Sequence, residues 1–381
     1  MSKSSLFIPV NEPRIDQIDI EEVSKTLSKN WVSSEAPIVK DFEKKFAKLF
    51  NRKFGISVCN GTVALDLAIK SLEIEKDSEV ILPNFTIISC ASAIIRNNLQ
   101  PRFVDANIND WNIDADLIES EITSRTKAIM IVHIYGMPSN VKKILKIAKK
   151  YNLKVIEDFA EAIGSEFENK PCGMFGDISI TSLYSNKHIT TGEGGMILTN
   201  NKKLQEKCIY YRNLCFMPDK RFYHIDLGWN YRMTALQAAL GTNQLKRIDK
   251  IVNYKIRIGD IYRTYLNDLN AILLQPPKNK YSTNINWVFG IVLKKSSKVK
   301  KKVLQNKLFK MGIETRPFFY PLNKQPALIK NEQVNFDRDK DYPVSKYIYD
   351  NGFYLPTGLG TSLTTIETVA KKTRDLLLKY E

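Results

Sequence analysis

Short apolar runs alternate with stretches of helical periodicity between about residues 55 and 200. Apolar runs bounded by turn residues are typical of buried strands, and apolar residues three and four positions apart indicate amphipathic helices. The pattern predicts helices over 62–72 and 141–151, and strands over 54–58, 79–83, 102–105, 128–133, 154–158 and 177–181. This alternation predicts an α/β fold with a mainly parallel sheet covered on both faces. Binding residues are then expected at the carboxyl ends of the strands.

The pattern changes near residue 245. A long charged helix over about 234–266, a strand over 286–293, a Lys-rich helix over 298–311 and a strand over 312–316 predict a smaller α+β unit. We therefore expect a large domain over residues 1–245 and a small C-terminal domain over 246–381. The N-terminal segment is free to pack on the small domain.

Composition narrows the class of protein. The chain has 381 residues, of which 43% are hydrophobic, so it can bury a sizeable core. No apolar run approaches the ~18–20 residues that cross a bilayer, and Pro9 and Asn11 interrupt the segment where a signal peptide is apolar. The five cysteines lack CxxC spacing, and the three histidines lack HxxxH or HxxE spacing. These features predict a cytoplasmic protein with reduced thiols and argue against disulfide or metal sites.

The formal net charge of +16 raises the question of nucleic-acid binding. The lysines are spread along the chain, for example over 142–150 and 294–302, which is typical of solvated helix faces. We therefore expect neither nucleic acid nor membrane as a partner. A positive field instead favours a polyanionic substrate such as a nucleoside diphosphate.

Two segments carry candidate chemistry in the first half of the chain. Cys59-Asn-Gly-Thr62 is a glycine-containing turn that opens a helix, where free N–H groups and the helix dipole suit a phosphate. Thr62 could equally be a simple N-cap. The second segment, Val155 to Ala162, ends an apolar strand with acidic residues. A buried carboxylate needs a partner, either the protonated ring nitrogen of a cofactor or an Arg or Lys in a structural ion pair, and both remain open.

Lys187 follows a buried-type strand and precedes a glycine-rich turn, Thr190-Thr-Gly-Glu-Gly-Gly195. Most lysines in a lysine-rich chain lie on the surface. A lysine in a partly apolar site, however, has a lowered pKa and acts as a Schiff-base nucleophile. The fourth segment, Leu227 to Leu240, is a polar aromatic turn that opens a helix, and its simplest interpretation is a capped helix with a packed Trp.

Together these segments resemble the site of aspartate-aminotransferase-like enzymes that use pyridoxal 5'-phosphate (PLP). More closely, the chain resembles the DegT/DnrJ/EryC1/StrS family of sugar aminotransferases over nearly its whole length. The motifs that carry the resemblance are Asn30-Trp-Val-Ser-Ser34, Ser57-Val-Cys-Asn-Gly-Thr-Val-Ala-Leu65, Phe103-Val-Asp105, Val132-His-Ile-Tyr-Gly136, Glu157-Asp-Phe-Ala-Glu-Ala162, Phe175-Gly-Asp-Ile-Ser179, Asn186-Lys187, Thr190-Thr-Gly-Glu-Gly-Gly195, Gly228-Trp-Asn-Tyr-Arg-Met-Thr234 and Glu314-Thr-Arg-Pro-Phe-Phe-Tyr-Pro321.

The resemblance implies PLP fold type I, a homodimer with shared active sites, and roles for individual residues. Lys187 would form the Schiff base and then move protons, and Asp158 would keep the ring nitrogen protonated. Substrate contacts are implied for Ser33, Ser34, His188 and Arg316, the last from the partner subunit. Cofactor contacts are implied for Asn60, Gly61, Thr62, Phe85, Asp158, Glu161, Ser182, Lys187 and, from the partner subunit, Asn230.

The implied reaction has two halves. An amino acid, usually glutamate, leaves its amino group on the cofactor, and C4 of a nucleotide-linked 4-keto-6-deoxysugar then receives it. Within the family the chain is most similar to enzymes that aminate GDP-4-keto-6-deoxymannose for surface polysaccharide synthesis. The alternatives are a UDP- or dTDP-linked sugar, PLP-dependent removal of a 3-hydroxyl, and a PLP-binding regulator without turnover.

Four positions depart from the family pattern. Ile87 replaces an aromatic residue that stacks on the cofactor ring, so either this aliphatic side chain packs on the ring or Phe85 takes over that contact. Ala36 and Ser185 replace glycines, and Asn323 replaces a histidine. We expect these changes to cluster at the sugar and to affect the choice of substrate rather than the chemistry. His188 follows Lys187, whereas the dehydrating branch of the family has histidine in place of the lysine.

Overall fold

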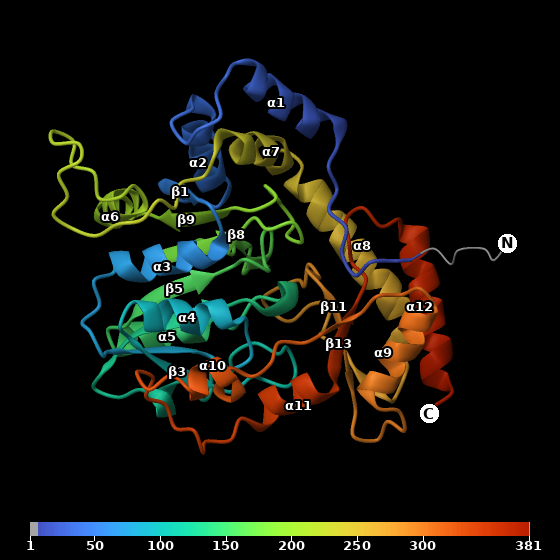
Figure 1. The fold of residues 1–381 in the computed structure, drawn as a ribbon. Coiled ribbons are helices and arrows are strands. Elements are labelled where there is room, and N and C mark those ends of the chain that lie inside the picture. Colours follow the sequence, from blue (N-terminus) through green and yellow to red (C-terminus); the bar gives the residue numbers. More distant parts are fainter. Residues whose placement is uncertain (1–6, 381) are drawn as a thin grey trace.

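The computed structural model describes residues 7–380. Its centre is a seven-stranded sheet with strand order β1-β9-β8-β5-β4-β2-β3 (Figure 1). All strands run in one direction except β9, which is antiparallel to both β1 and β8. The strands are β1 (Phe54–Val58), β2 (Glu79–Pro83), β3 (Gln100–Val104), β4 (Thr126–Val132), β5 (Lys154–Asp158), β8 (Ile178–Ser182) and β9 (Gly195–Thr199). The predicted mainly parallel sheet is confirmed, and β9 is the strand that the apolar pattern missed.

Alternate side chains of the central strands face opposite layers of helices. Val80, Leu82 and Met130 pack with α3 and α4, whereas Ile81 and Ile129 pack with α5. Both faces are therefore covered, as parallel sheets require. The helices around this sheet are α2 (Pro37–Leu49), α3 (Gly61–Ser71), α4 (Ile88–Arg96), α5 (Val141–Lys150) and α6 (Lys202–Arg212).

The expected long helix over 234–266 is wrong, because two helices occupy this stretch. They are α7 (Ala235–Leu245) and α8 (Ile248–Leu266), separated at Lys246 and Arg247. Arg247 leaves the helical conformation, with φ of −111° and ψ of 8°, and its guanidinium pairs with Asp16 and with Asp19 at 2.6 Å. These two carboxylates lie just before and within α1 (Gln17–Ser28), which packs on α7.

The C-terminal part builds a second sheet with strand order β10-β11-β13-β12. Its core includes Ile258 and Tyr262 of α8, Leu304 of α9 and Leu377 of α12. Ile8 pairs with Ile313 beside this core, so the N-terminal segment does reach it. The elements are β10 (Ile272–Leu273), β11 (Phe289–Leu293), α9 (Lys301–Lys310), β12 (Arg316–Pro317), α10 (Pro326–Ile329), α11 (Pro343–Asn351), β13 (Gly352–Leu355) and α12 (Leu363–Leu378).

The two sheets have separate hydrophobic cores, but some residues of the C-terminal part belong to the core of the large sheet. Leu328 of α10 and Ile348 of α11 pack on the core of the large sheet. The division at residue 245 therefore stays a prediction.

No helix in the described part of the chain has the length and apolar character needed to span a membrane. Minor elements are η1 (Glu119–Glu121), η2 (Ile134–Gly136), η3 (Leu322–Lys324), β6 (Glu166–Phe167) and β7 (Lys170–Pro171).

Candidate active site

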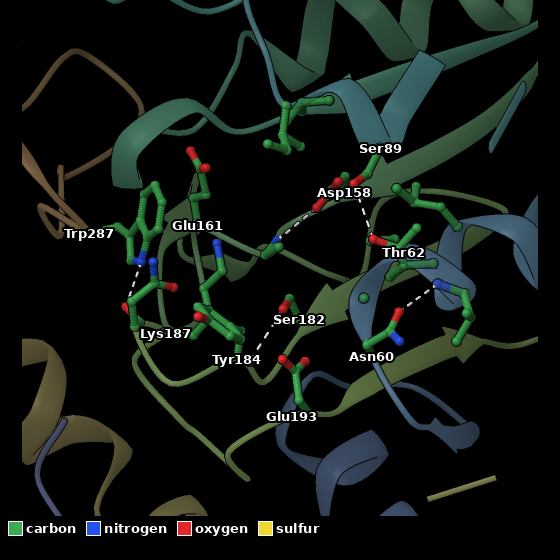
Figure 2. Close-up of a pocket in the computed structure, with 18 of the residues that line it drawn as sticks. Asn60, Thr62, Ser89, Asp158, Glu161, Ser182, Tyr184, Lys187, Glu193 and Trp287 are labelled. Carbon is green, nitrogen blue, oxygen red and sulfur yellow. Dashed lines mark hydrogen bonds between the residues drawn. The ribbon is translucent and has the colours of Figure 1, made fainter. Parts of the chain in front are cut away.

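A cavity of about 590 Å³ opens at the carboxyl ends of the central strands. Val132, Asp158 and Ser182 line it at the ends of β4, β5 and β8, and the first turn of α3 forms another wall. The carboxyl ends of parallel strands lie along one edge of the sheet, which explains why segments distant in sequence meet here. Figure 2 shows Lys187 beside Glu161 and Trp287, with Asp158, Thr62 and Ser89 grouped across from them.

The first turn of α3 forms an anion cradle. Asn60, not Thr62, is the N-cap, and its side-chain oxygen accepts the N–H of Val63 at 3.0 Å. The first N–H groups of the helix, at Gly61 and Thr62, have no partner within the helix. A Cβ atom on Gly61 would lie only 2.7 Å from the Cβ of Ser182, so the two segments meet as closely as they do only because residue 61 is glycine. The positive end of the dipole and these N–H groups suit a phosphate.

Asp158 ends β5 as a buried carboxylate that faces the cavity. One oxygen accepts the N–H of Ala160 at 2.9 Å, and the thiol of Cys90 lies 3.6 Å from the other. Burial raises the pKa of Asp158, and the Ala160 amide and the charge of Lys187 oppose this effect. Within residues 7–380 no Arg or Lys forms an ion pair with Asp158. Asp158 therefore has no structural ion pair in the described part of the chain, and its carboxylate can bind a cation that enters the cavity.

Lys187 projects into the same cavity from the turn after β8 (Figure 2). Burial lowers the pKa of its amine, and the carboxylates of Glu161 and Asp158 oppose that change. A lowered pKa increases the share of neutral amine at neutral pH, and neutral amine is the nucleophilic form. Lys187 is thus placed and tuned to react with an electrophilic carbon.

Glu161 is buried next to Lys187, and one of its oxygens accepts the N–H of Tyr135 at 2.9 Å. Burial raises the pKa of Glu161, while the charge of Lys187 lowers it. Two acids with different partners thus flank one amine. Such a set of perturbed groups in a cavity is typical of a catalytic site.

Another polar cluster lies behind the site. The Nε2 of His133 is 3.2 Å from Glu157, and His133 Nδ1 accepts the N–H of Ser139. Glu157 also accepts the N–H groups of Gly173, Phe175 and Gly176 and the hydroxyl of Ser179. N–H and O–H donors thus occupy the lone pairs with which His133 and Glu157 could otherwise bind a metal ion. The same network fixes the strand that carries Asp158.

Several residues named from the sequence lie outside the cavity. Phe85 is fully buried against Tyr135, Phe318 and Phe319, whereas the half-exposed Ile87 lines the cavity. The expected contact of Phe85 with the cofactor ring is therefore not supported by this packing. His188 is 1% exposed, and its ring lies behind the wall.

The remaining residues of the implied site lie at the surface. Ser33 and Ser34 line a separate cavity with Arg221 and Arg232, and Asn230 pairs with Asn213 at its edge. Arg316 is half-exposed and is paired in register with Tyr354, which lines the cavity of the same chain. Arg316 itself does not line this cavity, and its contribution from a partner subunit stays a prediction.

The four departures from the family pattern occupy different places in the fold, and their expected grouping around the sugar stays a prediction. Asn323 is buried. Its amide oxygen accepts from the side-chain amide of Asn84 at 3.0 Å, and its backbone N–H donates to the side-chain oxygen of Asn84 at 2.9 Å. Ala36 is buried at the N-terminus of α2. Only Ile87 of the four lines the cavity within residues 7–380.

Sequence reasoning missed the aromatic residues of the wall, which are Tyr184 and three residues from the C-terminal part of the chain. Trp287 precedes β11, Phe319 follows β12, and Tyr354 lies in β13. Phe319 belongs to a motif that supported the family resemblance without a role being given to it. The other two stand in apolar runs that read as ordinary core strands.

The comparisons with known proteins decide the family. Residues 13–374 match the model of the DegT/DnrJ/EryC1/StrS aminotransferase family. The chain belongs to this family. A GDP-perosamine synthase of Escherichia coli O157:H7 is 37% identical over 351 residues, which cover 92% of this chain and 93% of that protein.

Solved structures show the same fold. The aminotransferase PseC of Helicobacter pylori, involved in pseudoaminic acid biosynthesis, matches with a TM-score of 0.91 at 24% identity, covering 98% of this chain and 100% of that one. An E. coli GDP-4-keto-6-deoxy-D-mannose-3-dehydratase with bound hydrated PLP matches with a TM-score of 0.89 at 24% identity, over 98% and 100% of the two chains. The family, the fold-type I architecture and the assignment to PLP-dependent aminotransferases are thus confirmed.

Proposed function

We propose that this protein transfers an amino group from an amino acid, glutamate as the first candidate, to C4 of GDP-4-keto-6-deoxymannose. The observation that carries the proposal is the amine of Lys187 in a cavity between two buried carboxylates, Asp158 and Glu161. The 37% identity to a GDP-perosamine synthase supports the choice of sugar and nucleotide.

The residues present fit PLP. The cradle of Gly61, Thr62 and Ser182 suits its phosphate, and the buried Asp158 suits a protonated ring nitrogen. Ile87 would pack on the ring, because it is the residue of its loop that faces the cavity. Bound there, PLP supplies an aldehyde that takes up amines and a ring that withdraws electrons from them.

The side chains would divide the remaining work. In each half of the reaction, Lys187 Nζ would take a proton from one carbon and return it to another: it would take the proton from the carbon that bears the departing amine in the first half, and deliver one to the sugar carbon that gains the amine in the second. The carboxylate of Asp158 would favour the protonated form of the ring nitrogen. Glu161, whose pKa is raised by burial, would be the group able to hold a proton beside Lys187.

A homodimer would complete the site. Apolar side chains of the extension after α6 are exposed in the single chain, with Phe222 at 76%, Ile225 at 63% and Leu227 at 91%. The same extension protrudes from the body of the molecule (Figure 1). A second copy that covers it would bring Asn230, Ser33 and Ser34 toward the neighbouring cavity. Arg316 would bind the nucleotide diphosphate.

All five cysteines are free thiols, which supports a reducing, cytoplasmic location.

The test is a single incubation series. The protein, loaded with PLP, receives glutamate and GDP-, UDP- or dTDP-linked 4-keto-6-deoxysugars, and products are identified by mass and NMR. An amino sugar formed from the GDP substrate is expected. A product without nitrogen would favour the dehydratase, amination of another nucleotide sugar would change the substrate, and no spectral change with glutamate would favour a regulator.

A further inference from the structure

The nearest partner of the Lys187 amine is an aromatic ring. Its Nζ lies 3.8 Å from the centroid of the Trp287 indole. In the described part of the chain no carboxylate forms an ion pair with Lys187, although Glu161 and Asp158 act on it through space. A cation is attracted to the face of a Trp ring within about 6 Å, and more strongly when water is excluded.

Trp287 is held from three directions. Its indole N–H donates to the carbonyl of Asn186, the residue before Lys187, at 2.8 Å. Its backbone N–H donates to the carbonyl of Tyr135 at 3.1 Å. Its own carbonyl accepts from Lys255 Nζ at 2.7 Å. The ring therefore cannot turn away from Lys187 without breaking a bond to the loop that carries Lys187 (Figure 2).

Lys255 is a buried residue that holds the backbone of Trp287 in place. It lies on α8, is 3% exposed, and also donates to the carbonyl of Thr357 at 2.7 Å. Burial lowers the pKa of Lys255 to about 7, with no carboxylate of residues 7–380 opposing it. A neutral amine retains two N–H groups, which match the two carbonyls that it contacts. Lys255 thus ties α8 to the segments before β11 and after β13.

We propose that Trp287 is a positioning residue that holds the Lys187 amine whenever that amine is not bound to the cofactor. The inference rests on the proposed function, since it concerns the lysine that the reaction frees in one half and needs back in the other. The carboxylates are less suited to this task. Asp158 is needed at the ring nitrogen, and one oxygen of Glu161 accepts from Tyr135.

The experiment measures Lys187 in the full-length chain freed of PLP. Acetic anhydride acetylates the neutral amine, and competitive labelling from pH 6 to 11, read by peptide mass spectrometry, gives the pKa and the reactivity of Lys187 alone. The groups that face this amine are Glu161, Asp158, Cys90 and the indole. The variants are Trp287→Leu, Trp287→Phe and, as a matched loss of an aromatic wall residue, Phe319→Leu.

Trp287→Leu removes the face that stabilises the ammonium. We expect the pKa of Lys187 to fall by about half a unit to one unit in this variant, and by less in Trp287→Phe. Phe319→Leu keeps the indole, and any water that it admits to the cavity relieves desolvation, so the pKa of Lys187 should stay in place or rise. Equal values in Trp287→Leu and Phe319→Leu would overturn the proposal.

A second measurement avoids any change of shape. The chain has four Trp residues, and replacing them biosynthetically with 5,6,7-trifluorotryptophan weakens the negative face of the ring while keeping its size. The pKa of Lys187 should again fall. An unchanged value in a folded protein would overturn the role of the ring. Because neither measurement needs substrate or turnover, a wrong substrate assignment leaves both results interpretable.

Discussion

The two parts of the molecule contribute different chemistry to one cavity. The large sheet supplies charge and backbone dipoles, through Asp158, Lys187 and the first turn of α3. The C-terminal segments supply aromatic surface, through Trp287, Phe319 and Tyr354. Under the proposed function, the first set would activate the reacting atoms and the second set would shape the space around them. The reaction type and the substrate choice should therefore respond to mutations in different parts of the chain.

The largest effect is expected at Lys187. Lys187→Ala removes the nucleophile and the proton carrier together, so amino transfer should fall by more than about a thousandfold. The change in PLP absorbance after addition of glutamate measures the first half-reaction. Lys142→Ala is the control, since Lys142 is exposed, pairs with Glu168 at the surface and does not line the cavity. Retained transfer in Lys187→Ala would mean that another group carries the proton.

Asp158→Asn tests the charge from the large sheet without changing the size of the side chain. Removing one partner of a buried charge pair costs about 3–5 kcal/mol, so the first half-reaction should slow by roughly two to three and a half orders of magnitude. Because burial raises the pKa of this carboxyl, the cofactor-free variant should melt no lower than the parent chain. A clear loss of stability without PLP would instead assign Asp158 a structural role.

Gly61→Ala tests the phosphate cradle. Its new Cβ would lie 2.7 Å from the Cβ of Ser182, and overpacking of this kind costs about 1–3 kcal/mol. We expect the affinity for PLP, measured by titration and fluorescence, to fall by about five- to a hundredfold. A Gly61→Ala, Ser182→Gly double variant removes the contact, and its loss should be smaller than the sum of the two single losses.

The two parts also differ in how well the sequence predicts them. Strands such as β5 and helices such as α3 have apolar patterns of the right length, and Asp158 and Lys187 stand out because charge at the end of a buried strand needs a reason. Trp287 and Tyr354 carry no such signal, since an aromatic residue in a strand is usually core. Phe85 illustrates the converse error, because only tertiary packing decides that it points away and Ile87 inward.

A prediction for the aromatic wall follows from this difference. Tyr354→Leu removes about 0.5–1.5 kcal/mol of ring contact, so the KM for the nucleotide sugar should rise by about two- to twelvefold. The half-reaction with glutamate, which needs the groups of the large sheet, should change by no more than about twofold. Steady-state kinetics with each substrate varied in turn separates the two. Equal losses in both halves would contradict the division of labour between the two parts.

The smallest effect on turnover is expected from Lys255, which joins α8 to the aromatic wall and whose measurable effect is on stability. Its pKa is about 7 in the folded protein and about 10.4 in an unfolded chain. Between these values the unfolded chain binds a proton that the folded chain does not, so this residue makes folding less favourable as the pH falls from about 10 toward 7. Below pH 7 both states are protonated and the effect levels off.

Urea unfolding at pH 7 and at pH 9 should show that the parent chain gains stability relative to Lys255→Met by up to about 1.4 kcal/mol for each pH unit. The two carbonyls that lose their donor in Lys255→Met add a cost that does not depend on pH, so the slope rather than the absolute difference is the test. If the free energy of unfolding changed equally with pH in the two proteins, Lys255 would be charged in the folded state. An ammonium group would then contact the carbonyl of Trp287.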